Sequence, residues 1–302
     1  MVITLVGPTA VGKTAISLLL ARELAGEVVS ADSRQVYRGM DIGTAKITPA
    51  EMAGVPHHLI DIRQPDETIS LGEYKNLADA AIEDVLARGR LPLLVGGTGQ
   101  YVRAVIEGWR IPRVPPQPAL RRELEALAAR EGKETVFARL QALDPASAQT
   151  IDYRNLRRVI RAIEVSLVAG RPFSELQTKQ PPPWRIVQIG LTRPRELLYA
   201  RADARIEAMF AAGWVDEVRT LLASGCTPDL PSFASLGYRE IAAYLAGECN
   251  LEEAKIRIRR ATREFIRRQY NWFRLTNPDI RWFDLEQVGP EAVLAWAKNV
   301  VS

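Results

Sequence analysis

A complete phosphate-loop motif lies near the N-terminal end of the sequence. The pattern G-x-x-x-x-G-K-[ST] is filled in order by Gly7, Pro8, Thr9, Ala10, Val11, Gly12, Lys13 and Thr14. Such a loop points backbone N–H groups at phosphate oxygens, while its lysine supplies charge and its hydroxyl reaches a magnesium ion. The motif predicts a site for a phosphate or pyrophosphate group, but it leaves open which molecule carries that group.

The residues on either side of the motif suit an anion site. Met1–Val6 is an apolar run that predicts a buried strand, and Lys13–Leu24 predicts an apolar helix. The N-terminus of that helix adds its dipole to the site. Glycine-rich turns that bind nothing also join strands to helices. Because every motif position is filled in the right context, phosphate binding is the favoured interpretation.

A carboxylate ends the second predicted strand, Glu27–Asp32. Ligands of an open parallel sheet lie beyond the carboxyl ends of its strands, so Asp32 should lie beside the phosphate loop. It could ligate magnesium, cap a helix or act as a base. The fourth predicted strand, Leu91–Gly97, continues into Thr98, where a nucleotide hydrolase often carries a magnesium-binding Asp. This hydroxyl weakens the hydrolase interpretation, although Asp61 remains a possible substitute.

The sequence offers few residues for a transition-metal site. It contains two histidines and two cysteines, so a Cys/His zinc site would need nearly all of them. His57 and His58 are neighbours in the third predicted strand region, where successive side chains point to opposite faces. Cys226 and Cys249 are too few for a disulfide framework. We therefore expect no structural metal and no disulfide scaffold.

Arginines gather in two predicted helices. The first cluster consists of Arg154, Arg157, Arg158 and Arg161. The second lies in Lys255–Arg274, which carries eight basic residues and one acid. At 100° per residue one stripe of this segment holds Arg260, Arg263, Arg267, Tyr270 and Arg274, and the opposite stripe holds Ile258, Thr262, Phe265, Gln269 and Trp272. A solvated face usually mixes acids and bases, so the arginine stripe favours nucleic-acid phosphates, with Arg263 and Arg267 as contacts and Tyr270 for base stacking.

Strands and helices alternate over the first 110 residues, and this order predicts a parallel sheet with helices on both faces. His58–Ile62 is the expected third strand. Proline-rich stretches at Arg110–Pro118 and Gln180–Pro183 read as linkers. The segment between them has only helical periodicity, so residues 113–183 are predicted to form a helical insertion between the core segments 1–112 and 184–302. The expected insertion helices are Leu120–Ala129, Lys133–Leu143 and Arg154–Ala169; the returning strands are Trp184–Leu191 and Ile280–Leu285.

The composition is that of an ordinary soluble enzyme. Apolar residues make up 47% and charged residues 25% of the chain, and the net charge is +4. No apolar run approaches the ~20 residues that span a bilayer, and a core strand stands where an export signal would be. We expect a cytoplasmic protein without a membrane partner. The small net charge leaves nucleic-acid binding to be argued from the arginine clusters.

At this point the sequence resembles a known family, the tRNA dimethylallyltransferases in their bacterial form. The resemblance covers nearly the whole chain. Its most specific part is D-S-R-Q-V-Y-R-G-M-D-I-G-T-A-K, from Asp32 to Lys46. The phosphate loop, P-H-H-L-I-D-I, L-L-V-G-G-T-G-Q-Y, R-R-V-I-R-A-I-E, L-G-Y-R-E-I and R-R-Q-Y-N-W-F-R accompany it in the family's order. The absence of a cysteine framework agrees with the bacterial form, because eukaryotic relatives carry a C-terminal zinc finger.

The resemblance implies a reaction and roles for its residues. A dimethylallyl group would pass from dimethylallyl pyrophosphate to the exocyclic N6 amine of the adenosine 3′-adjacent to the anticodon, with release of pyrophosphate. Asp32 would be the general base. Lys13, Thr14 with Mg²⁺, Thr98 and Arg205 would serve the leaving pyrophosphate and the reacting groups. The implied fold is a P-loop NTPase-like α/β core with an all-helical insertion. The resemblance also implies that the protein acts as a monomer on the anticodon stem-loop of tRNA.

The tRNA contacts implied by the resemblance lie in four regions of the chain. They are Asp32, Ser33, Arg34 and Gln35; Thr98; Arg121, Arg157, Arg158, Val159, Ile160 and Arg161; and Ala234, Ser235, Leu236, Gly237, Tyr238 and Arg239. Gln35 suits an adenine edge, since its amide both donates and accepts. The target base would have to leave the anticodon loop stack to reach the site.

Two departures from the family pattern and two rival functions remain. Gln100 stands where an apolar residue is usual in the family, and I-D-Y-R-N from Ile151 to Asn155 replaces the family's usual I-H-P-N-D/N run near the insertion. The main rival is an ATP-dependent small-molecule kinase. The other is a nucleic-acid-binding protein that hydrolyses a nucleoside triphosphate. Whether ATP binds at all is not decided by the sequence.

Overall fold

The computed structural model describes residues 1–301, and a six-stranded parallel sheet runs through it. Its order is β3-β2-β4-β1-β5-β6, with every neighbouring pair parallel. The strands are β1 (Val2–Val6), β2 (Gly26–Ser30), β3 (His57–His58), β4 (Leu91–Val95), β5 (Ile186–Thr192) and β6 (Ile280–Asp284). The predicted α/β class with a parallel sheet is therefore confirmed.

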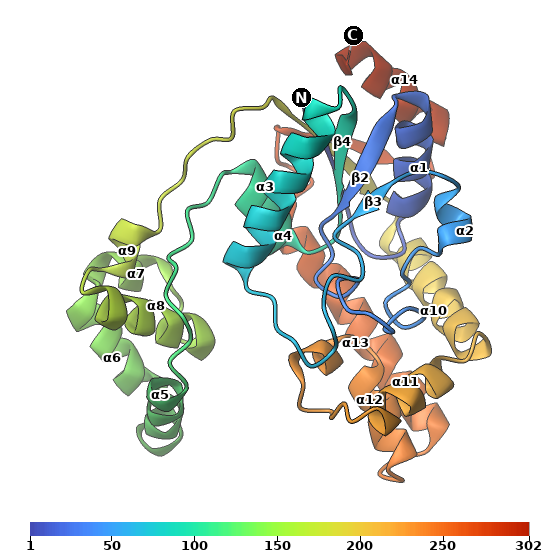
Figure 1. Cartoon of the computed structure of the whole chain (residues 1–302). Coiled ribbons are helices and arrows are strands. Elements are labelled where there is room, and N and C mark those ends of the chain that lie inside the picture. Colours follow the sequence, from blue (N-terminus) through green and yellow to red (C-terminus); the bar gives the residue numbers. More distant parts are fainter. Residues whose placement is uncertain (302) are drawn as a thin grey trace. The chain divides into compact units, whose positions relative to one another are not determined.

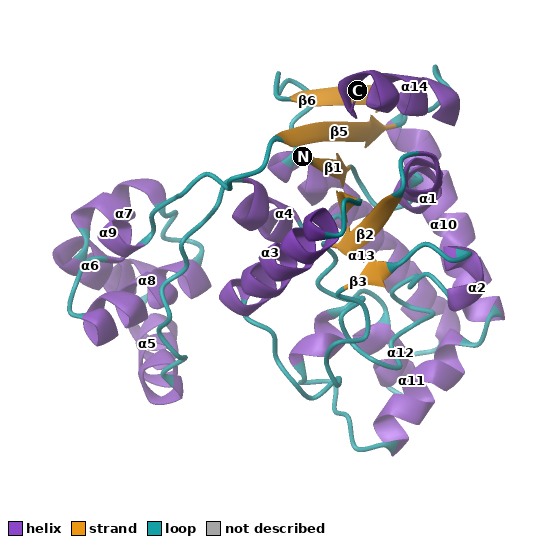
Figure 2. Cartoon of the chain, turned by 45° about the horizontal axis from the view of Figure 1, so that its top comes forward, coloured by secondary structure: helices purple, strands orange, loops and turns teal. Residues whose placement is uncertain are grey.

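Helices cover both faces of this sheet, as Figure 2 shows. Helices α1 (Lys13–Glu23) and α14 (Pro290–Val301) pack on one face, where Ile16, Leu20 and Val293 are fully or almost fully buried. Helices α3 (Leu71–Ala87) and α4 (Gly99–Ile106) cover the other face. Because both faces are covered, β1 and β2 are buried along their whole length and need no polar alternation.

The third strand is shorter than predicted. The sequence indicated His58–Ile62, whereas β3 is His57–His58. Leu59 and Asp61 have positive φ values of 64° and 55°, which no strand contains. The amide of Asp61 donates to the carbonyl of Gln35, and the amide of Ile62 donates to that of Val36. The apolar pattern of this segment reflects packing against the loop after β2 and not a longer strand.

A group of helices follows β5 and supports the loop after β2. These are α10 (Arg195–Ala211), α11 (Trp214–Ala223), the 3-10 helix η1 (Pro231–Ala234), α12 (Tyr238–Leu245) and α13 (Leu251–Trp272). Their apolar side chains enclose Val36, Tyr37 and Met40 in one core cluster with Trp214. Figure 1 shows these helices in yellow to orange beside the blue loops. A short helix, α2 (Pro49–Met52), lies in the segment between β2 and β3.

Residues Glu107–Pro182 form a second compact unit, apart from the unit of Met1–Ile106 and the residues from Pro183 on. Its helices, green in Figure 1, are α5 (Pro118–Glu131), α6 (Lys133–Leu143), α7 (Pro145–Thr150), α8 (Leu156–Ala169) and α9 (Phe173–Leu176). Leu124, Leu140 and Ile163 belong to its own apolar core. The helix expected from Arg154 begins at Leu156, because the side chain of Asn155 caps it by accepting from the amide of Arg158.

The insertion was predicted to span residues 113–183, and the second unit of the structure spans Glu107–Pro182. The second unit begins before the first proline-rich stretch. There the two linkers pair with each other: Gln180 N donates to Gly108 O, and Trp109 forms an antiparallel bridge with Lys179.

Among the described helices, none has both the length and the apolar character needed to cross a membrane.

Candidate active site

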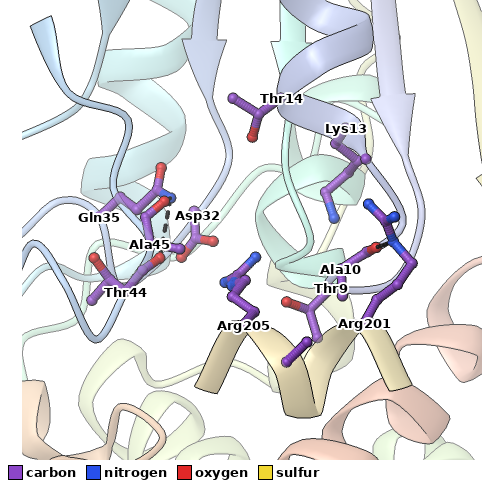
Figure 3. A pocket seen from close by; sticks show the side chains of 12 residues that line it. Thr9, Ala10, Lys13, Thr14, Asp32, Gln35, Thr44, Ala45, Arg201 and Arg205 are labelled. Carbon is purple, nitrogen blue, oxygen red and sulfur yellow. Dashed lines mark hydrogen bonds between the residues drawn. The ribbon is translucent and has the colours of Figure 1, made fainter. Parts of the chain in front are cut away.

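One cavity of about 370 Å³ opens at the carboxyl end of the sheet and is shown in Figure 3. The phosphate loop forms one wall, the segment that begins with Asp32 a second, and α10 a third. The lining residues are Thr9, Ala10, Gly12, Lys13, Thr14, Asp32, Gln35, Thr44, Ala45, Arg201, Ala204 and Arg205. The structure thus brings together the loop, the segment that carries Asp32 and Gln35, and Arg205, three features that are separated in the sequence.

Residues after β5 fix the conformation of the phosphate loop. Gly7 has a φ of 146°, and a Cβ on it would lie 2.5 Å from the carbonyl oxygen of Leu191. Only glycine therefore allows the loop to pack this closely against the end of β5. Arg193 Nε donates to Val11 O at 3.0 Å, and Arg201 Nε donates to Ala10 O at 2.9 Å. These two bonds join the loop to the residues that follow β5.

The surroundings of Lys13 have opposing effects on the pKa of its amine. Its Nζ donates to Gly7 O and Pro8 O, each at 2.9 Å, which holds it at the mouth of the loop. Burial lowers the pKa of Lys13 to about 8, while the nearby Asp32 carboxylate raises it and Arg205 lowers it further. A polyanion bound in this cavity would favour the charged amine and raise this pKa again.

The affinity for inorganic pyrophosphate should therefore depend on pH. Lys13 with a pKa of about 8 is charged below pH 8, so affinity should be full there and fall as pH rises above 8. Calorimetry at pH 8 in buffers of different ionisation enthalpy should detect proton uptake on binding. A Lys13→Arg variant stays charged and is the control. A wild-type affinity that is flat from pH 7 to 9.5 would contradict the prediction.

Asp32 holds the start of the segment that follows β2. Its Oδ1 accepts from the amide of Arg34 at 2.8 Å, which closes a turn and does not cap a helix. The helix-cap interpretation is therefore replaced by a turn. The carboxylate faces Arg205, which extends from α10 between Asp32 and Lys13 (Figure 3). Within one cavity, a carboxylate that can accept a proton lies beside two cations that can bind an anion.

Thr98 is not among the residues that line the cavity, but it contacts Ser33, the residue after Asp32. Its Oγ1 accepts from the amide of Ser33 at 3.0 Å and donates to Ser33 Oγ at 3.2 Å, and its amide donates to Ala31 O. It thus joins the end of β4 to the residues flanking Asp32. Gln35 lines the cavity, but its Nε2 already donates to Thr44 O and Ala45 O. Its expected pairing with an adenine would therefore have to use Oε1 or exchange these bonds.

Four lining residues were not predicted, namely Thr44, Ala45, Arg201 and Ala204. Thr44 and Ala45 belong to a loop held by Glu217, whose carboxylate accepts from the amides of Asp41, Ile42 and Gly43 at 2.6–3.2 Å. Tyr238 OH donates to the same carboxylate at 2.7 Å, and burial together with this charge raises the pKa of Tyr238. The spacing R-A-D-A-R, with Arg201 one helical turn before Arg205, was a sequence signal for Arg201, and the family-like run from Asp32 to Lys46 contains Thr44 and Ala45.

The segment Ala234–Arg239 is more buried than its expected role requires. Ser235, Gly237 and Tyr238 are buried, Leu236 is half-buried, and only Ala234 and Arg239 are exposed. The Tyr238 hydroxyl serves Glu217, so its side chain supports the Thr44 loop and cannot be an open RNA contact. Arg34 Nη1 donates to Pro231 O at 3.0 Å, which places η1, at the start of this segment, beside the residues that follow Asp32.

In the second unit, the predicted contacts divide into structural and exposed residues. Val159 and Ile160 are fully buried or nearly so within the helical core, because they occupy the inner face of α8. Their expected contact with RNA is corrected to a packing role. Arg121 and Arg161 both bind the fully buried Glu164 at 2.6–2.8 Å. Their hydrogen bonds, together with that from Gln117 N, help to hold the pKa of Glu164 at about 2.

Helix α13 confirms the packing stripe, leaves Arg260, Arg267 and Arg274 of the arginine stripe exposed, and gives Arg263 and Tyr270 partners within the protein. Ile258, Thr262 and Gln269 are buried as predicted. Arg263, however, forms an ion pair with Asp203 and lies 5.5 Å over the ring of Tyr199. The acid comes from the neighbouring α10, which the sequence of α13 alone cannot show. The hydroxyl of Tyr270 is 2.9 Å from that of Thr192, and the half-buried ring packs on the core, so it is no open stacking platform.

Two metal-ligand candidates have other partners. Asp61 does not replace a magnesium-binding carboxylate, because its Oδ1 is bound by Lys46 Nζ at 2.5 Å and it does not line the described cavity. His58 Nε2 lies 2.8 Å from the buried Glu27, and His57 Nδ1 lies 2.9 Å from Val55 O. No group of three or more His, Cys, Asp or Glu side chains within residues 1–301 has a metal-binding arrangement.

Comparisons with known proteins agree on one family. A family model described as IPP transferase matches residues 35–276. A tRNA dimethylallyltransferase of Roseiflexus sp. (strain RS-1) is 56% identical over 97% of this chain and 98% of its own. One from Chloroflexus aurantiacus is 58% identical over 90% and 92%. The crystal structure of a tRNA isopentenylpyrophosphate transferase from Bacillus halodurans matches with a TM-score of 0.73 at 42% identity, covering 99% of this chain and 95% of that one.

Proposed function

The chain belongs to the IPP transferase family, and we propose on this premise that it transfers a dimethylallyl group from dimethylallyl pyrophosphate to tRNA. The acceptor is the exocyclic N6 amine of the adenosine on the 3′ side of the anticodon, and pyrophosphate is released. A small-molecule kinase is not favoured, because the relatives described above are named tRNA dimethylallyltransferases.

The observation that carries this proposal is the cavity that holds Lys13, Arg205 and Asp32 together. The cations suit a pyrophosphate leaving group, and the single lining carboxylate suits a base. Among the described residues that line the cavity, Asp32 is the one acid. The position after β4 where a hydrolase often has a second carboxylate is occupied by Gly97 and Thr98.

The proposed reaction is a displacement at the allylic C1. The N6 nitrogen forms a bond to C1 with its lone pair, while the bond from C1 to the pyrophosphate oxygen breaks and its electrons stay with the leaving group. Lys13 and Arg205 stabilise the negative charge that develops on that oxygen. The nitrogen becomes acidic only as it bonds to carbon, and Asp32 then accepts its proton.

A magnesium ion fits the donors of this cavity. Mg²⁺ prefers oxygen ligands and commonly takes one or two from the protein, with phosphate oxygens and water completing its shell. Thr14 offers a hydroxyl and Asp32 a carboxylate in the same cavity. When bound, the ion would neutralise part of the pyrophosphate charge. Thr14 is the residue that we assign to it.

We assign the grip on the anticodon stem-loop to the helical insertion, the predicted residues 113–183. Arg157 and Arg158 are exposed on α8, next to the buried residues that fix this helix in the insertion core. In the unit that holds the cavity, exposed Arg239 and half-buried Arg34 offer further charge for RNA phosphates. We also propose that the protein acts as a monomer in the cytoplasm, where its tRNA substrate is found.

Two measurements test the proposed function. Calorimetry in magnesium should show binding of dimethylallyl pyrophosphate and weaker or no binding of ATP. Incubation with tRNA should release pyrophosphate only when tRNA and dimethylallyl pyrophosphate are both present, and mass spectrometry of the digested tRNA should find dimethylallyl-adenosine. ATP-dependent phosphorylation of a small molecule without tRNA modification would overturn the proposal.

Replacing Arg157 and Arg158 together by Ala should weaken tRNA binding and flatten its salt dependence. Each lost phosphate contact should reduce the slope of log K against log salt by about 0.7 to 0.9. Filter binding from 50 to 300 mM salt measures this slope. Arg154→Ala is the matched control, because Arg154 is also exposed but already paired with Asp152 at 2.6 Å. Equal slopes for the double variant and the wild type would exclude these arginines as phosphate contacts.

A further inference from the structure

The side chain of Gln269 on α13 is buried between the two halves of the site. Its Oε1 accepts from the amide of Thr9 in the phosphate loop at 2.8 Å. Its Nε2 donates to the carbonyl of Gly97, after β4, at 3.1 Å. Only 5% of the residue is exposed, so water cannot readily replace either partner. One amide therefore bridges segments that are 88 residues apart in the sequence.

Each of these partners leads directly to a group that we place in the reaction. Thr9 lies in the phosphate loop and lines the cavity, and it is followed by Ala10, which has a φ of 63° and whose carbonyl accepts from Arg201. On the other side, Gly97 precedes Thr98, whose hydroxyl holds Ser33 beside Asp32. The bridge thus runs from the loop that binds pyrophosphate to the segment that carries the base.

We propose that Gln269 is a positioning residue that fixes the phosphate loop relative to Asp32, so that the leaving group and the base keep one separation. The inference rests on the proposed function, because it assumes that both groups act on one substrate pair. Gln269 touches neither substrate and acts through Thr9 and through Gly97 with Thr98. The phosphate-loop motif by itself does not supply this constraint.

The bridge needs an amide. Thr9 presents an N–H and Gly97 a carbonyl, so the side chain must accept at one end and donate at the other. The opposite amide orientation would set donor against donor and acceptor against acceptor. A carboxylate would satisfy Thr9 but would face the Gly97 carbonyl unprotonated, and an aliphatic side chain would leave both buried groups unpaired.

Gly97 is shaped to admit this amide. A Cβ on Gly97 would lie 2.3 Å from Gln269 Nε2, while the nearest atom outside Gln269 and the residues adjoining Gly97, Lys13 Nζ, would be 3.7 Å away. A methyl group at this position would therefore displace the Gln269 amide first. Gly97→Ala and Gln269→Ala should break the same bridge from opposite ends, which allows a double-mutant cycle.

The experiment compares Gln269→Leu, Gln269→Glu and Gln269→Ala with the wild type. We expect Gln269→Leu to weaken binding of inorganic pyrophosphate about tenfold and to slow single-turnover transfer about tenfold, since two buried groups lose their partner. Gln269→Glu should bind pyrophosphate less well still, because it adds negative charge near the site. Thr262→Val, at a similarly buried polar position on the same face of α13, should change neither quantity.

The cycle distinguishes positioning from a general loss of stability. Gly97→Ala with Gln269→Ala should be no slower than Gln269→Ala alone, and melting temperatures should not follow the rates. Additive losses, or rates that track stability in every variant including Thr262→Val, would overturn the proposal. If the wild type transfers no dimethylallyl group, the proposed function fails. The pyrophosphate arm still decides the bridge, because wild-type affinity in Gln269→Leu would refute it.

Discussion

Replacing Asp32 by Asn should lower kcat by about 10²-fold or more, because the amide cannot take the proton of the attacking amine. Asn keeps an Oδ1 that can accept from the amide of Arg34, so the turn after β2 should survive. Melting temperature and pyrophosphate affinity should therefore change little. Single-turnover transfer to tRNA, measured at saturating substrates, gives the rate of the chemical step.

Asp61→Asn is the matched control for this prediction. Asp61 is also a carboxylate near the carboxyl end of the sheet, but Lys46 binds it and it does not line the described cavity. The control should lose some stability and keep kcat. For Asp32→Asn, lost stability with a normal kcat would assign the carboxylate to the turn alone. A large loss that raised magnesium restores would assign it to the metal.

Replacing Lys13 by Met should reduce kcat/KM for dimethylallyl pyrophosphate by about 10²–10³-fold, the usual effect of removing one donor to a developing oxyanion. Pyrophosphate affinity should fall as well, because Met removes the cation at the mouth of the loop. Steady-state kinetics and calorimetry with the variant measure the two quantities. Lys75→Met, at a half-buried lysine paired with Asp79 on α3, should leave both unchanged.

The stability of the Lys13→Met variant provides an independent check. The folded-state pKa of about 8 lies below the ordinary 10.5, so charged Lys13 is unfavourable for folding below pH 8. That cost disappears as pH rises from 8 to 10.5. Loss of the bonds to Gly7 O and Pro8 O offsets part of the gain from Met. At pH 7 the melting temperature should be unchanged or higher, and a clear fall would mean that Lys13 serves the fold.

Sequence patterns predicted correctly those features that depend on residues close together in the sequence. The phosphate loop is a contiguous motif, and its glycines and lysine act through their own backbone and the next helix. The buried runs of β1 and β2 predict strands because both faces of a parallel sheet are covered. The position of Asp32 followed from the rule that ligands lie beyond the strand ends. These inferences needed no knowledge of distant contacts.

Other features depend on partners that are remote in the sequence. The arginine stripe of α13 looked unmixed because Asp203, which neutralises Arg263, belongs to α10. Val159 lies within an arginine-rich run, yet the fold of the insertion turns it inward. The segment His58–Ile62 was predicted to be a strand, but the amides of Asp61 and Ile62 donate to carbonyls of the loop after β2.

The sequence by itself determined the α/β class, the phosphate loop and the family, because these are written in consecutive residues. Only the tertiary structure decided which residues share the cavity with that loop. Thr44 reaches it through Glu217, and Arg205 through the packing of α10. Gln269 bridges Thr9 and Gly97 although its own neighbours in sequence show only a helix. The physical reason is that hydrogen bonds and burial join atoms by distance in space, which a one-dimensional pattern does not contain.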